Sequence, residues 1–137
     1  MPEEKHRVVI DTNLWISFLL TRDFSKFDQL MSADWTTLLI SQELLEEVFE
    51  VAERPKFRKY FSLTDLTDLL VNLKQKAELV HVTSQFNVCR DDKDNFLLSL
   101  AIDGNATHLL TGDKDLLVLH PFHEVQIQTI ADYLSEK

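Results

Sequence analysis

The chain has 137 residues, of which 45% are hydrophobic and 27% are charged. This is the size and balance of one globular domain, and no low-complexity stretch or linker divides it, so we predict a single domain over residues 1–137. With 23 acidic residues against 14 basic ones, the net charge is −9, which excludes a protein that binds nucleic acid through an overall positive charge.

The first third of the chain alternates apolar runs with helical patterns. Arg7–Ile10 is a β-branched apolar run that predicts a buried strand, and Thr37–Ile40 predicts a second one. Between them, Leu14–Leu20 and Phe24–Met31 have the pattern of helices. Glu43–Arg54 follows with apolar residues at helical spacing, and the next residue is a proline, which ends or kinks a helix.

The middle of the chain predicts two helices, a strand and a loop. Lys56–Tyr60 is a short helix candidate, and a longer helix capped by Ser62 or Thr64 follows it. Leu79–Val82 is a third apolar run and predicts a strand. We predict a loop over residues 84–93.

The last third begins with a segment that is apolar nearly all round. Asp94–Asp103 is therefore predicted as a buried helix, with Gly104 at its C′ position. Residues 112–115, Gly-Asp-Lys-Asp, predict a turn. Two further strands and a final helix are predicted in this part: Thr107–Leu110, Val125–Gln128 and Ile130–Leu134.

Strands that alternate with helices indicate βαβ units with right-handed crossovers, and therefore a central parallel sheet with helices on both faces. In open sheets of this kind, ligands bind beyond the carboxyl ends of the strands, near the point where the strand order reverses. The predicted fold class is thus α/β, and the candidate site lies at that edge.

Several acids follow predicted strands or open predicted helices near this edge. Asp11 directly follows the first strand, and Asp113 and Asp115 follow the fourth. Asp94 opens the buried helix, and Glu47 lies in the helix after the second strand. Taken one at a time, these acids are equally explained as helix caps, turn residues or solvated helix positions. Their gathering at one edge favours a site.

The helix after the second strand offers a choice of acids. At 100° per residue, Glu47 borders the apolar stripe, whereas Glu46 lies further from its centre, so Glu47 is preferred and Glu46 remains the alternative. Converging carboxylates repel one another and must take up protons or a cation. Hard oxygen ligands suit Mg²⁺ or Mn²⁺, and such ions activate water for attack on a phosphodiester.

Four segments of the chain resemble the motifs of the PIN-domain family, in particular its branch of toxins from toxin–antitoxin pairs. Each segment is a weak signal alone, but the four in order and at suitable intervals are specific. They are Val9–Asn13, Glu43–Val48 leading to Arg54–Phe57, Cys89–Asn95 continuing through Ala101, and Thr111–Leu116. The resemblance covers nearly the whole chain.

The resemblance implies a three-layer α/β/α sandwich and a ribonuclease that needs Mg²⁺ or Mn²⁺ and leaves 5′-phosphate and 3′-hydroxyl ends. It implies catalytic roles for four acids: Asp11, Glu47, Asp94 and Asp113. It implies metal ligands at Asp11, Asp94, Asp113 and Asp115, with Asp94 or Asp113 accepting the proton of the attacking water. Polar residues that order the pocket are expected at four further positions: Thr12, Asn13, Asp91 and Thr111. Asn13 is expected to hydrogen-bond Asp11 or a neighbouring acid.

One dense basic cluster offers a surface for the RNA backbone. Its members are Arg54, Lys56, Arg58 and Lys59. They could guide RNA to the acids, and the alternative is a solvated helix end favoured by the helix dipole. From the resemblance we also expect an antitoxin partner, which a short basic or amphipathic segment would suit, and a homodimer.

The N-terminal residues lack the apolar core of a signal peptide, no apolar run approaches a membrane span, and Cys89 is the only cysteine. We therefore expect a soluble, cytoplasmic protein with no membrane contact. Two other function classes stay open: a catalytically silent PIN-like scaffold that binds RNA or protein, and another Mg²⁺-dependent phosphate enzyme. For the latter, residues 113–115 are similar to the Asp-x-Asp pair of Toprim domains, and Asp11-Thr12 faintly to aspartyl-phosphatases.

Overall fold

A computed structural model of the chain describes residues 5–21, 23–60 and 62–136. Within these residues, five strands form one sheet in which every neighbouring pair is parallel. The strands lie in the order β3-β2-β1-β4-β5. Their bounds are His6–Ile10 for β1, Thr36–Ile40 for β2, Ala77–Leu79 for β3, His108–Leu110 for β4 and Gln126–Gln128 for β5.

The apolar runs of the central strands are buried on both faces of the sheet. Val8 and Ile10 of β1 belong to one hydrophobic cluster, whereas Val9 between them belongs to the other. Leu110 and Leu109 of β4 divide in the same way. Because successive side chains of a strand point to opposite faces, a continuous apolar run requires a covering layer on each side.

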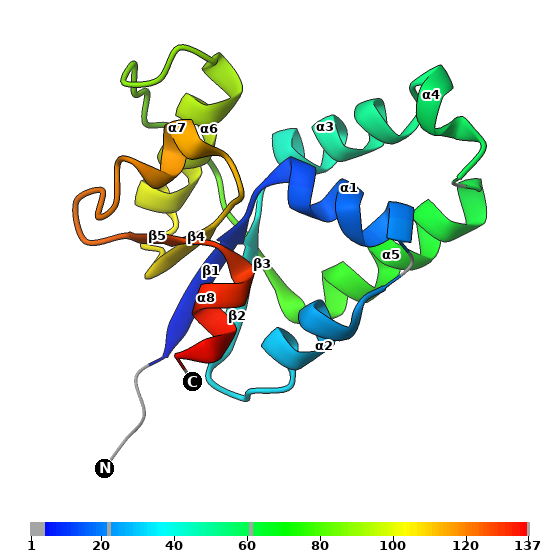
Figure 1. Cartoon of the computed structure of the whole chain (residues 1–137), viewed down its shortest axis with the longest axis horizontal. Coiled ribbons are helices and arrows are strands. Elements are labelled where there is room, and N and C mark those ends of the chain that lie inside the picture. Colours follow the sequence, from blue (N-terminus) through cyan, green and yellow to red (C-terminus); the bar gives the residue numbers. More distant parts are fainter. Residues whose placement is uncertain (1–4, 22, 61, 137) are drawn as a thin grey trace.

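Helices supply these two layers, as Figure 1 shows. One cluster is covered by α1, α2, α3, α5 and α8, and the other mainly by α6 and α7. Their bounds are Thr12–Thr21 (α1), Ser25–Met31 (α2), Gln42–Ala52 (α3), Leu63–Lys76 (α5), Asp92–Asp103 (α6), Lys114–Leu117 (α7) and Ile130–Ser135 (α8). The predicted three-layer α/β/α fold with a central parallel sheet is thus confirmed.

Helix caps explain where most helices begin. Ser41 accepts a hydrogen bond from the backbone N–H of Leu44 at 3.0 Å and caps α3. Ser62, rather than Thr64, caps α5 through a capping box with Asp65. Pro55 does not kink α3, which already ends at Ala52, but occupies the first turn of the short α4 (Pro55–Arg58).

Two predicted boundaries were wrong near the candidate site. The loop predicted over residues 84–93 is shorter, because Asp91 caps α6 and places Asp94 inside its first turn. The predicted turn at residues 112–115 is the start of α7, which Asp113 caps by accepting from the backbone N–H of Asp115. Two carboxylates therefore begin helices that the residue pattern alone did not separate from loops.

Two other predictions differ for reasons of packing. The third strand spans Ala77–Leu79 instead of the predicted Leu79–Val82, because α5 runs directly into the sheet beside β2. Gly104 is the C-cap of α6 with φ −87°, and the left-handed φ of 52° falls on Asn105. A Cβ at Gly104 would lie 2.9 Å from a methyl of Leu39, so the glycine permits close packing of α6 on the sheet.

The strand order reverses between β1 and β4, since the chain crosses from β1 to β2 on one side and reaches β4 on the other. The carboxyl ends of these two strands lead to Asp11 and to Thr111. They meet at the edge where an open parallel sheet binds ligands. Among the described residues, no helix is long and apolar enough to cross a membrane.

Candidate active site

A cavity of about 220 Å³ lies at this carboxyl edge of the sheet. The residues that line it come from the end of β1, from α1, α3, α4 and α6, and from the start of α7: Asp11, Thr12, Asn13, Ile16, Glu47, Val51, Arg54, Lys56, Phe57, Asp91, Lys93, Asp94, Leu97 and Asp113. The four acids predicted to be catalytic all reach it. Segments more than 100 residues apart in the sequence therefore form a single site.

Asp11 is held rigidly at the end of β1. Its Oδ2 accepts a hydrogen bond of 2.6 Å from the hydroxyl of Thr111, and its Oδ1 accepts one of 3.1 Å from the backbone N–H of Asn13. Only 5% of the residue is exposed. Burial raises the pKa of Asp11, and the hydrogen bond from Thr111 opposes that rise. The carboxylate thus caps α1 and still faces the cavity.

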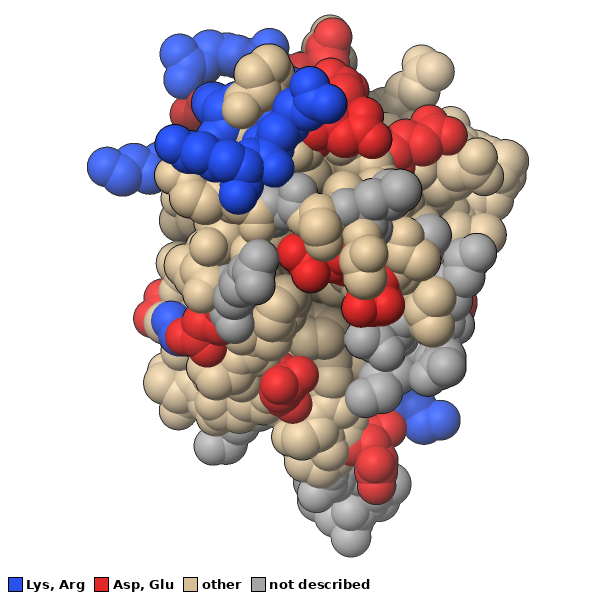
Figure 2. Space-filling model, turned by 90° about the vertical axis from the view of Figure 1, so that its right-hand side faces the viewer, with Lys and Arg blue, Asp and Glu red and all other residues tan. Residues whose placement is uncertain are grey.

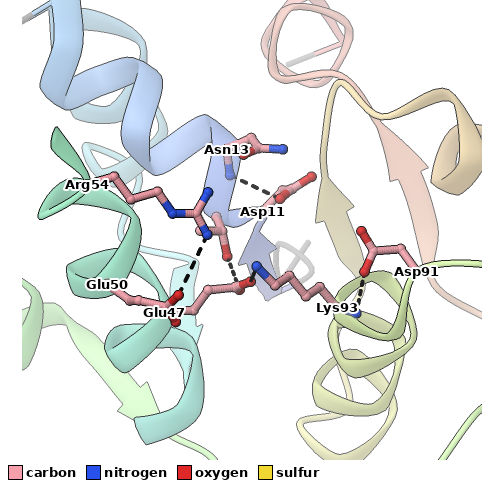
Figure 3. A network of polar contacts seen from close by, with 8 residues as sticks. Asp11, Asn13, Glu47, Glu50, Arg54, Asp91 and Lys93 are labelled. Carbon is pink, nitrogen blue, oxygen red and sulfur yellow. Dashed lines mark hydrogen bonds and ion pairs between the residues drawn. The ribbon is translucent and has the colours of Figure 1, made fainter. Parts of the chain in front are cut away.

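The Thr111 hydroxyl serves both sides of the switch point. Besides donating to Asp11, it accepts a 3.0 Å hydrogen bond from the backbone N–H of Asp113. One buried hydroxyl therefore ties the end of β1 to the start of α7. The hydrogen bond expected from Asn13 to Asp11 is donated by its backbone N–H, while its exposed side chain lines the cavity (Figure 3).

Three carboxylates gather beside Asp11. Asp94, Asp113 and Asp115 each place an oxygen within 4.8 Å of the others. Burial, and next the charge of Asp113, raise the pKa of Asp94 to about 7. Asp115 lies at the outer side of this group, outside the cavity lining, and pairs with Arg90 at 2.9 Å. The crowding leaves excess negative charge that only protons or a cation can offset.

Glu47 reaches the cavity from α3 on the opposite wall. Its Oε2 accepts a 2.6 Å hydrogen bond from the hydroxyl of Thr12, and its Oε1 lies 3.3 Å from Nζ of Lys93. Glu46 instead accepts a hydrogen bond from the side chain of Gln42 on the exposed side of the same helix. Of the two acids left open by the residue pattern, Glu47 is the one that faces the site.

The basic cluster divides between the cavity and the surface beyond it. Arg54 and Lys56 line the cavity, whereas Arg58 and Lys59 do not. Arg54 also pairs with Glu50 at 3.6 Å. On the face that carries α4, Lys and Arg side chains gather at the top beside a group of acids (Figure 2). The cavity therefore opens between acids at the sheet edge and basic side chains at the corner of α3 and α4.

Lys93 lines the cavity, although the sequence pattern did not predict it as a site residue. It lies in the stretch assigned to a loop, one residue before the predicted helix. A signal was available: a lysine in the first turn of a helix opposes the helix dipole, which favours acids at that end. Asp91, expected to order the pocket, lines the cavity and caps α6 through the backbone N–H of Lys93 at 3.0 Å.

The donor set fits a divalent cation. Asp94, Asp113 and Asp115 offer only carboxylate oxygens, which hard cations such as Mg²⁺ and Mn²⁺ prefer. Burial first, and then the charge of Asp113, raise the pKa of Asp94, and a bound cation would offset both effects. Cys89 is no competing nucleophile, because burial and then the charge of Asp94 raise the pKa of its thiol.

Comparisons with known proteins agree with this geometry. A family model described as PIN domain matches residues 7–115, which include every acid of the cavity. Uncharacterized protein MJ1680 of Methanocaldococcus jannaschii is 32% identical over 122 residues, which make up 87% of this chain and 78% of that protein. The family match therefore covers four of the five strands, β1 to β4, and both walls of the cavity.

Proposed function

This chain belongs to the PIN-domain family, and from that premise we propose that it is a metal-dependent endoribonuclease with its active site in the acidic cavity. PIN nucleases act on RNA, and their fold is that of the sheet and helices described above. The observation that carries the proposal is the convergence of Asp11, Glu47, Asp94 and Asp113 on one cavity at the switch point of the sheet.

We assign the binding of Mg²⁺ or Mn²⁺ to Asp94, Asp113 and Asp115, together with Asp11 on the same cavity wall. When bound, the cation supplies positive charge that lowers the pKa of water and offsets the charge of the phosphate. Thr111 holds the Asp11 carboxylate in place through its hydrogen bond, as groups behind a metal ligand commonly do.

The reaction is hydrolysis of a phosphodiester. Water attacks phosphorus, the bond to the 3′ oxygen breaks, and the leaving 3′ oxygen takes a proton from the solvent, so the products carry 5′-phosphate and 3′-hydroxyl ends. Asp94 or Asp113 accepts the proton of the attacking water. Glu47, fixed by Thr12, faces this group from the other wall and orients the water or the phosphate.

Arg54 and Lys56 give the RNA backbone a positive contact at the cavity, and Arg58 and Lys59 extend it along α4. The net charge of −9 disfavours RNA binding by the chain as a whole. The phosphates of RNA, however, contact the surface around the cavity, where these basic side chains give a local positive charge.

The test is cleavage of labelled single-stranded RNA by metal-stripped protein, with and without added Mg²⁺ or Mn²⁺. Wild-type protein should cleave only with metal, and the Asp94→Asn variant should lose cleavage while keeping the wild-type circular dichroism spectrum. Equal cleavage by both proteins would point to a contaminating nuclease and overturn the assignment. RNA binding without any cleavage under every metal condition would instead identify a catalytically silent scaffold.

We further propose that the protein is the toxin of a toxin–antitoxin pair and acts in the cytoplasm. A partner with a short basic or amphipathic segment would complement the acidic cavity, and a homodimer would present two such cavities. Expression of wild-type protein should arrest growth, and Asp94→Asn should relieve the arrest. Growth unaffected by active nuclease would contradict the toxin role but leave the nuclease intact.

A further inference from the structure

Lys93 occupies a position that local helix energetics disfavour. It lies in the first turn of α6, two residues after the N-cap Asp91, where the helix dipole is positive. The neighbouring first-turn residues Asp92 and Asp94 follow the usual preference for acids. A cation in this turn therefore needs a reason outside the helix.

The side chain of Lys93 provides that reason by reaching across the cavity. It extends from α6 to α3, where its Nζ lies 3.3 Å from Oε1 of Glu47 (Figure 3). Its side chain is 53% exposed, whereas that of Glu47 is 17% exposed. The ammonium group is thus open to the solvent at the mouth of the cavity, while its partner is recessed.

The pair with Glu47 does not use the full capacity of the ammonium group. A lysine ammonium has three N–H donors, and among the described residues Glu47 is its one ion-pair partner. Glu47 itself is already held by the hydroxyl of Thr12, so Lys93 is not required to orient it. Donors therefore remain for an anion that enters the cavity.

We propose that Lys93 is a phosphate-binding residue that contacts the phosphodiester at the active site. Arg54 and Lys56 line the cavity from the start of α4, so Lys93 from α6 adds a cation from the facing wall. RNA is a polyanion, and its scissile phosphate must come close to the acids of the cavity to meet the attacking water. An ammonium that exchanges Glu47 for a phosphate oxygen gives the substrate a contact at that point. This inference rests on the proposed function.

The experiment measures RNA binding separately from cleavage. In the Asp94→Asn background and with Mg²⁺ present, the Kd of a labelled single-stranded RNA is followed by fluorescence anisotropy over a range of salt concentrations. Lys93→Met should raise the Kd about tenfold, the scale of one charged hydrogen bond. It should also flatten the dependence of log K on log salt by about 0.7, the share of one phosphate contact on a single strand.

Lys114→Met is the matched control. Lys114 is exposed on the neighbouring α7 and does not line the cavity, so its loss changes the net charge equally without removing a contact. Lys114→Met should leave the salt slope unchanged, and Lys93→Arg should restore most of it. An identical effect of Lys93→Met and Lys114→Met would reduce Lys93 to a general charge and overturn the proposal.

A Glu47→Gln background distinguishes a phosphate contact from a simple counter-ion. If Lys93 only neutralised Glu47, Lys93→Met would lose its effect on RNA binding once Glu47 is neutral. The proposal expects the slope change to persist in that background. Metal-dependent cleavage that is lost in Asp94→Asn, together with an unchanged slope in Lys93→Met, would refute the Lys93 contact alone. Cleavage that does not depend on Asp94 would refute the proposed function first.

Discussion

The two ends of β1 and β4 treat their polar side chains in opposite ways. At the amino ends, His6 hydrogen-bonds the hydroxyl of Tyr133 at 2.6 Å, and His108 contacts the hydroxyl of Thr107 at 2.7 Å. At the carboxyl ends, Asp11 lies close to the carboxylates of Asp94, Asp113 and Asp115. The same two strands thus carry hydrogen-bonded histidine rings at one end and crowded carboxylates at the other.

The difference appears in the pKa values of the two buried groups. Burial, and then the charge of His6, lower the pKa of His108 to about 4, so this ring stays neutral. Burial and the charge of Asp113 raise the pKa of Asp94 to about 7, so this carboxyl resists ionisation. At neutral pH the amino end carries a neutral His108, whereas the carboxyl end crowds carboxyl groups whose repulsion a bound cation can relieve.

The largest expected effect lies in the choice between two adjacent acids. Glu47→Gln should lower kcat/KM for RNA by roughly a hundredfold, since it removes a carboxylate that faces the cavity. Glu46→Gln, on the exposed side of α3, should leave kcat/KM close to wild type. Kinetics of both variants on one RNA substrate decide the matter. The reverse ranking would mean that α3 turns its other acid toward the substrate.

Matched threonines at the two ends of β4 sharpen the comparison. Thr111→Val removes the hydroxyl that holds Asp11 and should lower kcat/KM about tenfold to a hundredfold. Thr107→Val removes a hydroxyl that bonds the backbone of Arg7 at the amino end and should leave kcat/KM unchanged. Each should cost about 1–3 kcal/mol in urea unfolding, because a backbone N–H loses its partner. A loss of activity in Thr107→Val would break the division of roles.

Stability should respond to pH through Asp94. The folded carboxyl keeps its proton up to about pH 7, whereas the unfolded one loses it near 3.8. The folded state therefore binds more protons in this range, and stability of the metal-stripped protein falls as the pH rises from about 4 to 7. Asp94→Asn should raise the free energy of unfolding at pH 7 by about 1 kcal/mol after allowance for solvent screening, and change little near pH 4. Urea titrations of both proteins across this pH range measure the difference. Equal free energies of unfolding for Asp94→Asn and wild type at pH 7 would contradict the crowding of carboxylates around Asp94.

The amino end should show the opposite sign. Unfolded His108 takes up a proton below 6.5, whereas the folded ring resists protonation down to about pH 4. The unfolded state then binds more protons, so this contribution to stability is lost as the pH falls from 6.5 to 4. His108→Phe should flatten that dependence by about 1 kcal/mol in the same titrations. If the free energy of unfolding of the variant fell more steeply than that of wild type between pH 6.5 and 4, the burial of a neutral His108 ring would be contradicted.

The residue pattern predicted the strands, the helices and their layered arrangement well, because apolar periodicity is local. Its errors fell on Asp91 and Asp113, whose side chains cap helices where a loop and a turn were expected. Asx residues favour loops and helix starts alike, so the pattern could not separate the two. It also placed Gly104 by backbone preference, whereas the structure uses it for close packing against Leu39.

By itself, the sequence determined the α/β class and the strand-end positions of Asp11 and Asp113, since both follow from short-range patterns. Only the tertiary structure decided which side chains meet. Thr111 reaches Asp11 across 100 residues, Lys93 reaches Glu47 from another helix, and the basic cluster divides at the cavity wall. These contacts depend on strand order and on how each helix is rotated against the sheet, which are set by packing of the whole core rather than by neighbouring residues.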